Sequence, residues 1–268
     1  MNILTQPMKD SFRADLLVGL PTINVNEITL GDSLELCERI PAKTVDLILE
    51  DMPYNTTACG WDKKIDLELY WKTRLRILKP TGVVVLTASQ PFTAELLMSN
   101  KTMFKYEWIW KRDRVTGFLN AKIMPMKEHE SILVFAEKIQ KYYPIKWLGR
   151  KAHKKGKIVG KKVNGGTYGN FTAVDSINDW KYPTSILEFD RPHPPIHPTQ
   201  KPVGLFEYLI RTYTDENDLV FDGFGGSGTT AIACHRSKRN FIVIEKGYTY
   251  YDLATKRLDN ERTQLSLL

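Results

Sequence analysis

One four-residue turn, Asp51-Met52-Pro53-Tyr54, combines groups that could activate an amine for alkylation. An exocyclic amine on adenine is a poor nucleophile because its lone pair is delocalised into the ring. If the Asp51 carboxylate and the Met52 carbonyl each accept one N–H hydrogen, the nitrogen becomes pyramidal and its lone pair is freed. Pro53 holds residue 52 extended, and Tyr54 offers a flat face for an extruded base. The alternative is a strand that ends in an Asp–Pro turn with a surface tyrosine.

A second feature is the glycine-rich loop Gly223-Phe-Gly-Gly-Ser-Gly228, which follows an apolar segment. Such a loop lets the backbone approach a ligand closely. Glu245 ends the next expected strand, where its carboxylate could accept both hydroxyls of a ribose. The combination favours an adenosine-type cofactor over a glycine turn without a ligand. Only about 45 residues follow the start of the loop, too few for the remaining units of a nicotinamide dehydrogenase fold.

Alternating strands and helices must position both features. The apolar patterns predict strands at 26–30, 44–50, 83–87, 218–221 and 240–245, and helices at 65–78, 91–99, 203–213, 227–236 and 248–258. This alternation predicts an α/β fold with a doubly wound, Rossmann-like, mostly parallel sheet. Asp51 and Gly223 both follow strands, so we expect them at the carboxyl edge of the sheet, where such folds bind ligands.

Positive charge is concentrated in the middle of the chain. The net charge is +7, yet residues 101–162 alone carry 17 Lys and Arg against 5 Asp and Glu. Aromatic residues are interleaved there, which suits a surface that holds phosphates and contacts bases, although a solvated lysine-rich face is also common. We expect residues 111–195 to form an insert for target recognition, and residues 22–110 and 196–268 to form the catalytic domain.

The composition is typical of a globular protein, with 42% hydrophobic and 26% charged residues. No apolar run is long enough for a membrane span or a signal-peptide core. Cys37, Cys59 and Cys234 are widely spaced, which favours a reducing compartment and gives no zinc pattern. His129, between two glutamates, also matches no zinc signature, and we interpret this cluster as structural. We therefore expect a cytoplasmic protein, in a bacterial or phage-infected cell, that needs no metal.

The order of the motifs resembles that of the DNA amino-methyltransferases, the N6-adenine and N4-cytosine family, in its permuted β-type arrangement. Asp51-Met-Pro-Tyr54 is similar to the family's D-P-P-Y, with Met52 in place of the first proline. Asp222-Gly-Phe-Gly-Gly-Ser-Gly-Thr-Thr230 resembles D-P-F-x-G-S-G-T-T, and Gly223, where proline is usual, should make the loop more flexible. His197-Pro-Thr-Gln-Lys-Pro202 matches the motif that precedes the loop. The resemblance covers nearly everything from about residue 26 onward.

The resemblance implies S-adenosylmethionine as cofactor and roles for further residues. Gln200 and Lys201 would approach the methionine end of the cofactor. Asp32 would accept its adenine amino group, or cap a helix, and Phe92 would pack against its adenine, or lie in the core. The implied cofactor-binding residues are Asp32, Phe92, Gln200, Lys201, Asp222, Phe224, Gly226, Gly228, Thr229 and Glu245. The residues expected to bind DNA are Lys111, Arg112, Arg114, Asn120, Lys122, Arg150 and Lys151.

The expected activity is methylation of adenine N6 in a short duplex DNA sequence. N4-cytosine methylation uses the same chemistry, and Asp51 favours adenine because cytosine-directed members more often begin the turn with serine. An RNA substrate and a non-catalytic nucleic-acid-binding subunit are further alternatives. Duplex DNA is the expected partner, and a cognate restriction endonuclease is a second candidate. Whether the chain is a monomer or a homodimer is left open.

Overall fold

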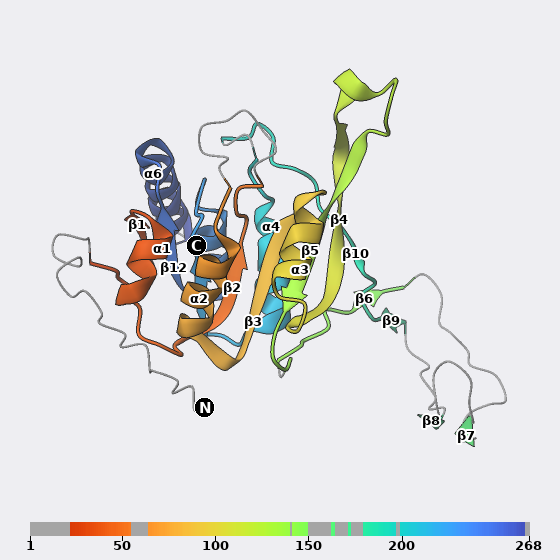
Figure 1. Ribbon diagram of the computed structural model, residues 1–268, viewed down its shortest axis with the longest axis horizontal. Helices are drawn as coiled ribbons and strands as arrows, with labels where there is room; N and C mark the ends of the chain where they lie inside the picture. The colour runs from red at the N-terminus through yellow and green to blue at the C-terminus, as the bar shows by residue number, and fades with distance from the viewer. Residues whose placement is uncertain are drawn as a thin grey trace, which may run out of the picture.

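The computed structural model describes residues 22–54, 64–139, 141–149, 162–163, 171–172, 179–196 and 199–265. Its centre is an eight-stranded sheet in the order β1-β12-β11-β2-β3-β5-β4-β10 (Figure 1). The strands are β1 (Glu27–Leu30), β2 (Val45–Glu50), β3 (Leu78–Ala88), β4 (Phe104–Thr116), β5 (Lys127–Phe135), β10 (Ile186–Glu188), β11 (Leu219–Asp222) and β12 (Asn240–Glu245). All neighbours pair in parallel except β5, which runs antiparallel to both β3 and β4.

Helices cover both faces of this sheet. They are α1 (Ser33–Leu36), α2 (Leu67–Ile77), α3 (Phe92–Ser99), α4 (Val203–Tyr213), α5 (Thr229–Ser237) and α6 (Tyr248–Leu265), with short 3-10 turns η2 (Cys37–Arg39) and η3 (Phe118–Asn120). Two short strand pairs, β6 (Trp147–Leu148) with β9 (Trp180–Lys181) and β7 (Lys162–Val163) with β8 (Phe171–Thr172), lie outside the main sheet. In the part of the chain that the structure describes, none of the helices has the length and apolar character that a bilayer span requires.

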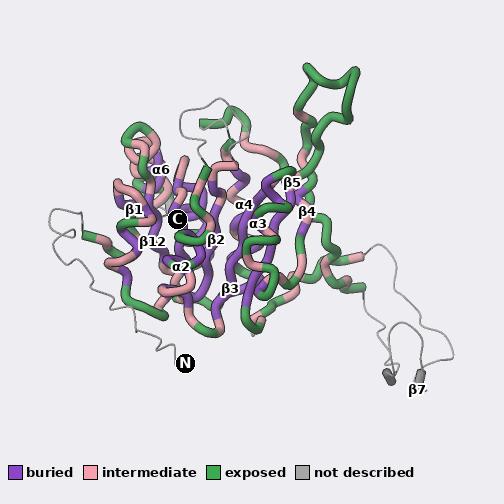
Figure 2. Tube along the Cα trace, viewed as in Figure 1, coloured by how far each residue is buried: buried purple, intermediate pink, exposed green. Residues whose placement is uncertain are grey.

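Two hydrophobic cores explain why these segments form a layered fold. All six residues of β2 are buried, as expected for a parallel strand that is covered on both faces. Leu205 and Leu209 of α4 pack on one face of the sheet, and Trp71 and Ile77 of α2 pack on the other. Figure 2 shows the same arrangement as a buried sheet enclosed by helices whose outer sides are exposed.

A buried ion pair lies beneath the carboxyl edge of the sheet. Glu50, the last residue of β2, and Arg74 of α2 are both fully buried, with 3.0 Å between Oε1 and Nη2. The Tyr70 hydroxyl donates to the second carboxylate oxygen of Glu50 at 2.5 Å, and the backbone N–H of Gly223 donates to the first at 2.9 Å. Removal of one partner from a buried pair costs about 3–5 kcal/mol, so this cluster strongly stabilises the contact between α2 and the glycine loop.

The expected elements of both flanks are present, with shifted ends. The expected helix 65–78 ends at Ile77, and Lys79 and Pro80 belong to β3 rather than to a helix end. Helix α6 runs to Leu265, beyond the expected end at residue 258. Residues 259–264 are polar and lie exposed or only partly buried, so apolar periodicity could not reveal the last two turns.

The middle of the chain is shared between the main sheet and a projection from it. Strands β5 and β10 fall inside 111–195, the range expected for an insert, yet both belong to the central sheet. Ile132–Phe135 of β5 are fully buried between β3 and β4. The sheet therefore extends into the expected insert, while the β4–β5 hairpin projects from the end of the sheet (Figure 1).

Candidate active site

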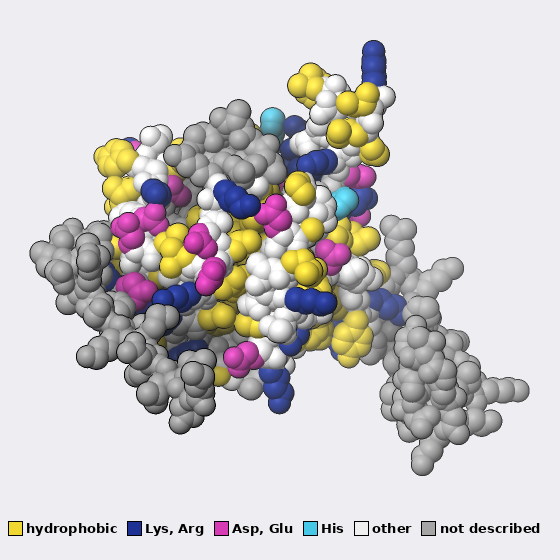
Figure 3. Space-filling model, viewed as in Figure 1, with side chains coloured by type: hydrophobic (Ala, Val, Ile, Leu, Met, Phe, Trp, Pro, Cys, Tyr) yellow, Lys and Arg dark blue, Asp and Glu magenta, His cyan; other side chains and the backbone are white. Residues whose placement is uncertain are grey.

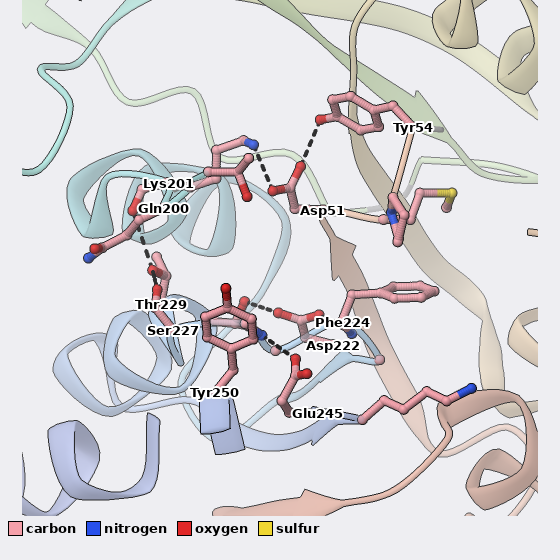
Figure 4. Close-up of a pocket in the computed structure, with 18 of the residues that line it drawn as sticks. Asp51, Tyr54, Gln200, Lys201, Asp222, Phe224, Ser227, Thr229, Glu245 and Tyr250 are labelled. Atoms are coloured by element: carbon pink, nitrogen blue, oxygen red, sulfur yellow. Dashed lines mark hydrogen bonds and ion pairs between the residues drawn. The ribbon is translucent and has the colours of Figure 1, made fainter. Parts of the chain in front are cut away.

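A pocket of about 930 Å³ opens at the carboxyl edge of the sheet. Three parallel strands end there, and each brings an acidic residue to the pocket. Asp51 follows β2, Asp222 ends β11 and Glu245 ends β12 (Figure 4). A pocket of this volume suits a ligand of cofactor size. The prediction that the aspartate turn and the glycine loop share one edge of the sheet is confirmed.

The Asp51 carboxylate accepts three hydrogen bonds. Its Oδ2 accepts from the Lys201 ammonium at 2.7 Å. Its Oδ1 accepts from the Tyr54 hydroxyl at 2.7 Å and from the Thr87 hydroxyl. The Tyr54 ring stacks on Phe92, with centroids 5.5 Å apart. Burial, together with the nearby carboxylates, raises the pKa of Tyr54 well above its ordinary value, so the phenol stays neutral and donates. The orientation of the carboxylate is therefore set by its neighbours.

Lys201 bridges two carboxylates and is almost completely buried. Besides Asp51, its ammonium lies 3.2 Å from Glu130 Oε2. Burial alone would lower the pKa of Lys201, but the two carboxylates outweigh it and raise the pKa, so the side chain remains charged. The other oxygen of Glu130 lies 3.3 Å from Arg112 Nη1. A chain of alternating charges therefore connects β4 to Asp51.

The glycine loop is held by Asp222, which is buried. Its Oδ1 accepts from the Phe224 N–H at 2.9 Å, and its Oδ2 accepts from the Thr230 hydroxyl. These bonds join the end of β11 to the first turn of α5. Gly228, at the cap of that helix, has φ +76°, and a Cβ there would lie 3.0 Å from the Cβ of Ala254. A side chain at this position would be strained, which explains the glycine.

Burial raises the pKa of Asp222 to about 8, and the hydrogen bond from Thr230 offsets only part of this rise. The folded chain therefore keeps a proton that the unfolded chain releases near the ordinary value of 3.8. This contribution to stability is fully present below about pH 4 and is lost as the pH rises toward 8. We expect the unfolding free energy of Asp222→Asn to fall less steeply with pH over this range than that of the unsubstituted protein. The two slopes should differ by up to about 1.4 kcal/mol per pH unit.

Urea denaturation of the cofactor-free protein at pH 5, 6.5 and 8 measures this slope. Asp252→Asn is the matched control, because that aspartate is exposed on α6 and should leave the slope unchanged. Equal slopes for Asp222→Asn and the unsubstituted protein would contradict the assignment.

Two further carboxylates line the pocket near the glycine loop. Glu245 accepts from the N–H groups of Gly226 and Gly247 at 2.7 and 2.6 Å. Asp32 caps α1 through Leu34, as its alternative interpretation predicted, and its Oδ2 also accepts from Lys246 at 2.7 Å. The helix cap does not exclude a role in binding, because Asp32 also faces the pocket.

The structure places most of the expected binding residues around this one pocket. Those that line it are Asp51, Met52, Pro53, Tyr54, Asp32, Gln200, Lys201, Asp222, Phe224, Gly226, Thr229 and Glu245. Phe92 lies behind Tyr54, and Gly228 begins α5, so neither lines the pocket. Within the described residues, no cluster of His, Cys, Asp or Glu side chains could hold a metal ion.

Five of the seven residues expected to bind DNA lie on the β4–β5 hairpin, in different surroundings. Arg112 lines the pocket, whereas Lys111 pairs with Glu188 and Arg114 pairs with Asp113 on the surface. Asn120 and Lys122 are exposed near the tip of the hairpin. Arg150, Lys151, Cys59 and the His197-Pro198 pair lie outside the described residues.

Glu130 is the main site residue that the sequence interpretation missed, because it was interpreted as structural. It lies on the face of β5 that also carries Ile132 and Val134, which are buried in the core. A carboxylate in register with core residues is unusual and could have identified it. Thr87, Arg191, Lys246 and Tyr250 were also missed.

Comparison with known proteins gives one family. The model of the N6/N4 DNA methylase family matches residues 45–256. The type II methyltransferase M.BglII of Bacillus subtilis is 28% identical over 261 residues, which cover 91% of this chain and 71% of the relative. The DNA adenine methyltransferase YhdJ of Escherichia coli K12 is 28% identical over 246 residues, which cover 85% and 81%. The solved complex of M1.HpyAVI with S-adenosylmethionine aligns with a TM-score of 0.59 and 25% identity, covering 87% and 99%.

Proposed function

Since this chain belongs to the DNA methylase family, we propose that it methylates N6 of adenine within a short sequence of duplex DNA. Methyl transfer to DNA and the cofactor S-adenosylmethionine follow from the family, and the choice of adenine is our proposal. The observation that carries it is the Asp51 carboxylate, held at the pocket as an acceptor for an amino hydrogen. Aspartate at this position and the likeness to YhdJ support adenine over cytosine.

The residues around the pocket fit S-adenosylmethionine. Glu245 presents a carboxylate beside a glycine-rich backbone, a combination that suits a ribose. We assign the adenosine end to Asp32, Phe224 and Glu245, and the amino-acid end to Gln200 and the start of α5. When bound, the cofactor supplies a methyl group on a positively charged sulfur.

The chain's own residues activate and hold the target amine. The Asp51 carboxylate accepts one amino hydrogen and the Met52 carbonyl accepts the other, which frees the lone pair of the nitrogen. Asp51 already accepts two hydrogen bonds at Oδ1 and one at Oδ2, so Oδ2 keeps an acceptor site for the amine beside Lys201. Lys201 can also shift to make room, because Glu130 is a second partner for its charge. The extruded base stacks on the Tyr54 ring.

For the DNA itself, we assign the region 111–195 to target recognition and the rest of the sheet to catalysis. The net positive charge of residues 101–162 supports a phosphate-binding surface there. Arg112, at the junction of hairpin and pocket, is the basic residue placed best to connect the two.

Methyl transfer from labelled S-adenosylmethionine to unmethylated genomic DNA, followed by nucleoside digestion and mass spectrometry, tests the proposal. N6-methyladenine is the expected product, and sequencing of the modified sites gives the recognition sequence. N4-methylcytosine would keep the reaction and overturn the choice of base. Methylation of RNA alone, measured in parallel, would overturn the substrate.

Lys201→Met is expected to lower kcat roughly thirtyfold or more, which corresponds to the 2 kcal/mol or more that a lost partner costs a buried charge pair. The substitution removes the charge between two carboxylates, and of the two only Glu130 keeps another cationic partner, Arg112. Lys246→Met is the control, because that lysine pairs with a pocket aspartate at the same 2.7 Å but is largely exposed. We expect it to change the rate by less than about fivefold. Similar losses in both variants would contradict the special role of Lys201.

A further inference from the structure

The β4–β5 hairpin continues well past the sheet that supports it. Lys111 is the last residue of β4 with a partner in β10, and Ser131 is the last residue that β5 pairs with β3 toward the hairpin tip. Beyond them the two strands pair only with each other, up to Thr116 opposite Lys127. The register shifts there, so that the five residues from 112 to 116 of β4 lie opposite two residues of β5.

The hairpin projects from the edge of the sheet that carries the pocket. Strand β4 runs in the same direction as β2, because β2 is parallel to β3 and β5 is antiparallel to both β3 and β4. The carboxyl ends of β2 and β4 therefore lie at one edge, and the hairpin projects from that edge (Figure 1). Arg112 and Thr116, on the shaft of the hairpin, line that pocket directly.

The tip of the hairpin carries large apolar side chains that face solvent. Phe118, Leu119 and Ile123 are 74%, 83% and 79% exposed. Figure 3 shows hydrophobic side chains gathered at this tip, away from the body of the protein. Clustered apolar side chains in water mark a binding surface rather than a core.

The hairpin also carries basic side chains, and their combination with the apolar tip indicates the partner. Lys111, Arg114, Lys122 and Lys127 are exposed on it, beside the acidic Asp113 and Glu128. Arg112 donates to the Thr116 hydroxyl at 3.1 Å. A two-stranded ribbon fits into a groove of duplex DNA, where basic groups can hold phosphates. Apolar side chains in such positions insert between base steps. The basic side chains therefore suit the phosphates of a duplex, and the apolar tip suits its stacked bases.

We propose that Phe118, Leu119 and Ile123 form a wedge that enters the duplex beside the target base and fills the space left in the stack. The proposal rests on the proposed function, because only an enzyme that acts on a base inside a duplex must extrude it. Asp51 lies within a pocket at the end of the sheet, so a stacked base cannot reach it. A wedge offsets the stacking energy lost when the base leaves.

The test uses a duplex with 2-aminopurine at the target adenine, whose position is read from the methylated genomic DNA. The double variant Phe118→Ser/Leu119→Ser is compared with the unsubstituted protein and with Met98→Ser, an exposed methionine on α3. The fluorescence of 2-aminopurine rises when the base leaves the stack, and we expect the double variant to lose most of this rise. On a matched duplex that keeps adenine at the target, we expect kcat/KM to fall about tenfold or more. With a mismatch opposite the target, which already weakens stacking, the fall should be less than about threefold.

An equal fall on matched and mismatched duplexes would overturn the wedge and indicate a general DNA contact. Unchanged activity on both would overturn it as well. Circular dichroism and calorimetric binding of S-adenosylmethionine check that the tip variants fold. Failure of the proposed function is distinguishable, because the unsubstituted protein would then leave genomic adenine unmethylated.

Discussion

Replacement of Asp51 by asparagine is expected to lower kcat for methyl transfer by on the order of 10²–10³-fold, the usual loss when one preorganised polar group is removed from an active site. The substitution preserves size but removes the negative charge. An amide presents N–H groups where the carboxylate presents an oxygen, so either Lys201 or the two hydroxyls of Tyr54 and Thr87 lose their acceptor. The target amine loses its acceptor in the same way.

The affinity for S-adenosylmethionine separates this role from a loss of structure. Asp51 lies at the catalytic end of the pocket, and the glycine loop is held by other acidic side chains, Asp222 and Glu245. We therefore expect the Kd of the cofactor, measured by calorimetry, to stay within about threefold in Asp51→Asn. Asp252→Asn, an exposed aspartate on α6, should retain full activity. Full activity in Asp51→Asn would contradict the mechanism.

The parts of the fold that could be predicted from sequence are those whose signals are local. The strand Asn240–Glu245 and the helix Val203–Tyr213 have the predicted bounds, because apolar runs and turn residues define both within a short window. Strand β5 was not predicted, since its place depends on pairing with β3 and β4, and its first half is polar. A local sequence pattern does not indicate which strands pair with each other.

The same distinction holds for the site. The aspartate turn and the glycine loop are contiguous motifs and could be recognised directly. The ion pair of Lys201 with Asp51 joins residues 150 positions apart, and the sequence suggested only a role toward the cofactor. Glu130 reaches this pair only because the register of β5 turns its side chain toward the pocket. Contacts of this kind follow from topology, which a residue pattern predicts only in outline.

Gly223 reverses the expectation that glycine loosens the cofactor loop. Its N–H donates to the buried Glu50 carboxylate at 2.9 Å. A Cβ at this position would lie 2.8 Å from Glu50 Oε1 and 2.7 Å from Ser33 Oγ, and closer still to the Arg74 guanidinium. The buried ion pair thus occupies the space that a side chain would need. The glycine lets the loop rest directly on the pair, which fixes the start of the loop.

Gly223→Pro, which restores the residue usual in the family, is therefore expected to damage this protein. The ring would displace Arg74 and remove the N–H that Glu50 accepts, so we expect the free energy of unfolding to fall by about 3–5 kcal/mol. The displaced loop should also bind S-adenosylmethionine at least about tenfold more weakly. Urea denaturation and calorimetry measure the two effects.

A double-mutant cycle tests the cause of the loss. In an Arg74→Met background the guanidinium is absent, so Gly223→Ala should cost less stability than it does in the unsubstituted protein. Gly204→Ala is the control for adding a methyl group, because a Cβ there meets the Phe189 ring at an ordinary 3.4 Å. If Gly223→Pro kept full stability and cofactor affinity, the buried pair would not be what fixes the loop. If the cycle showed no coupling, the cost would arise from the backbone, Ser33 or Glu50 rather than from Arg74.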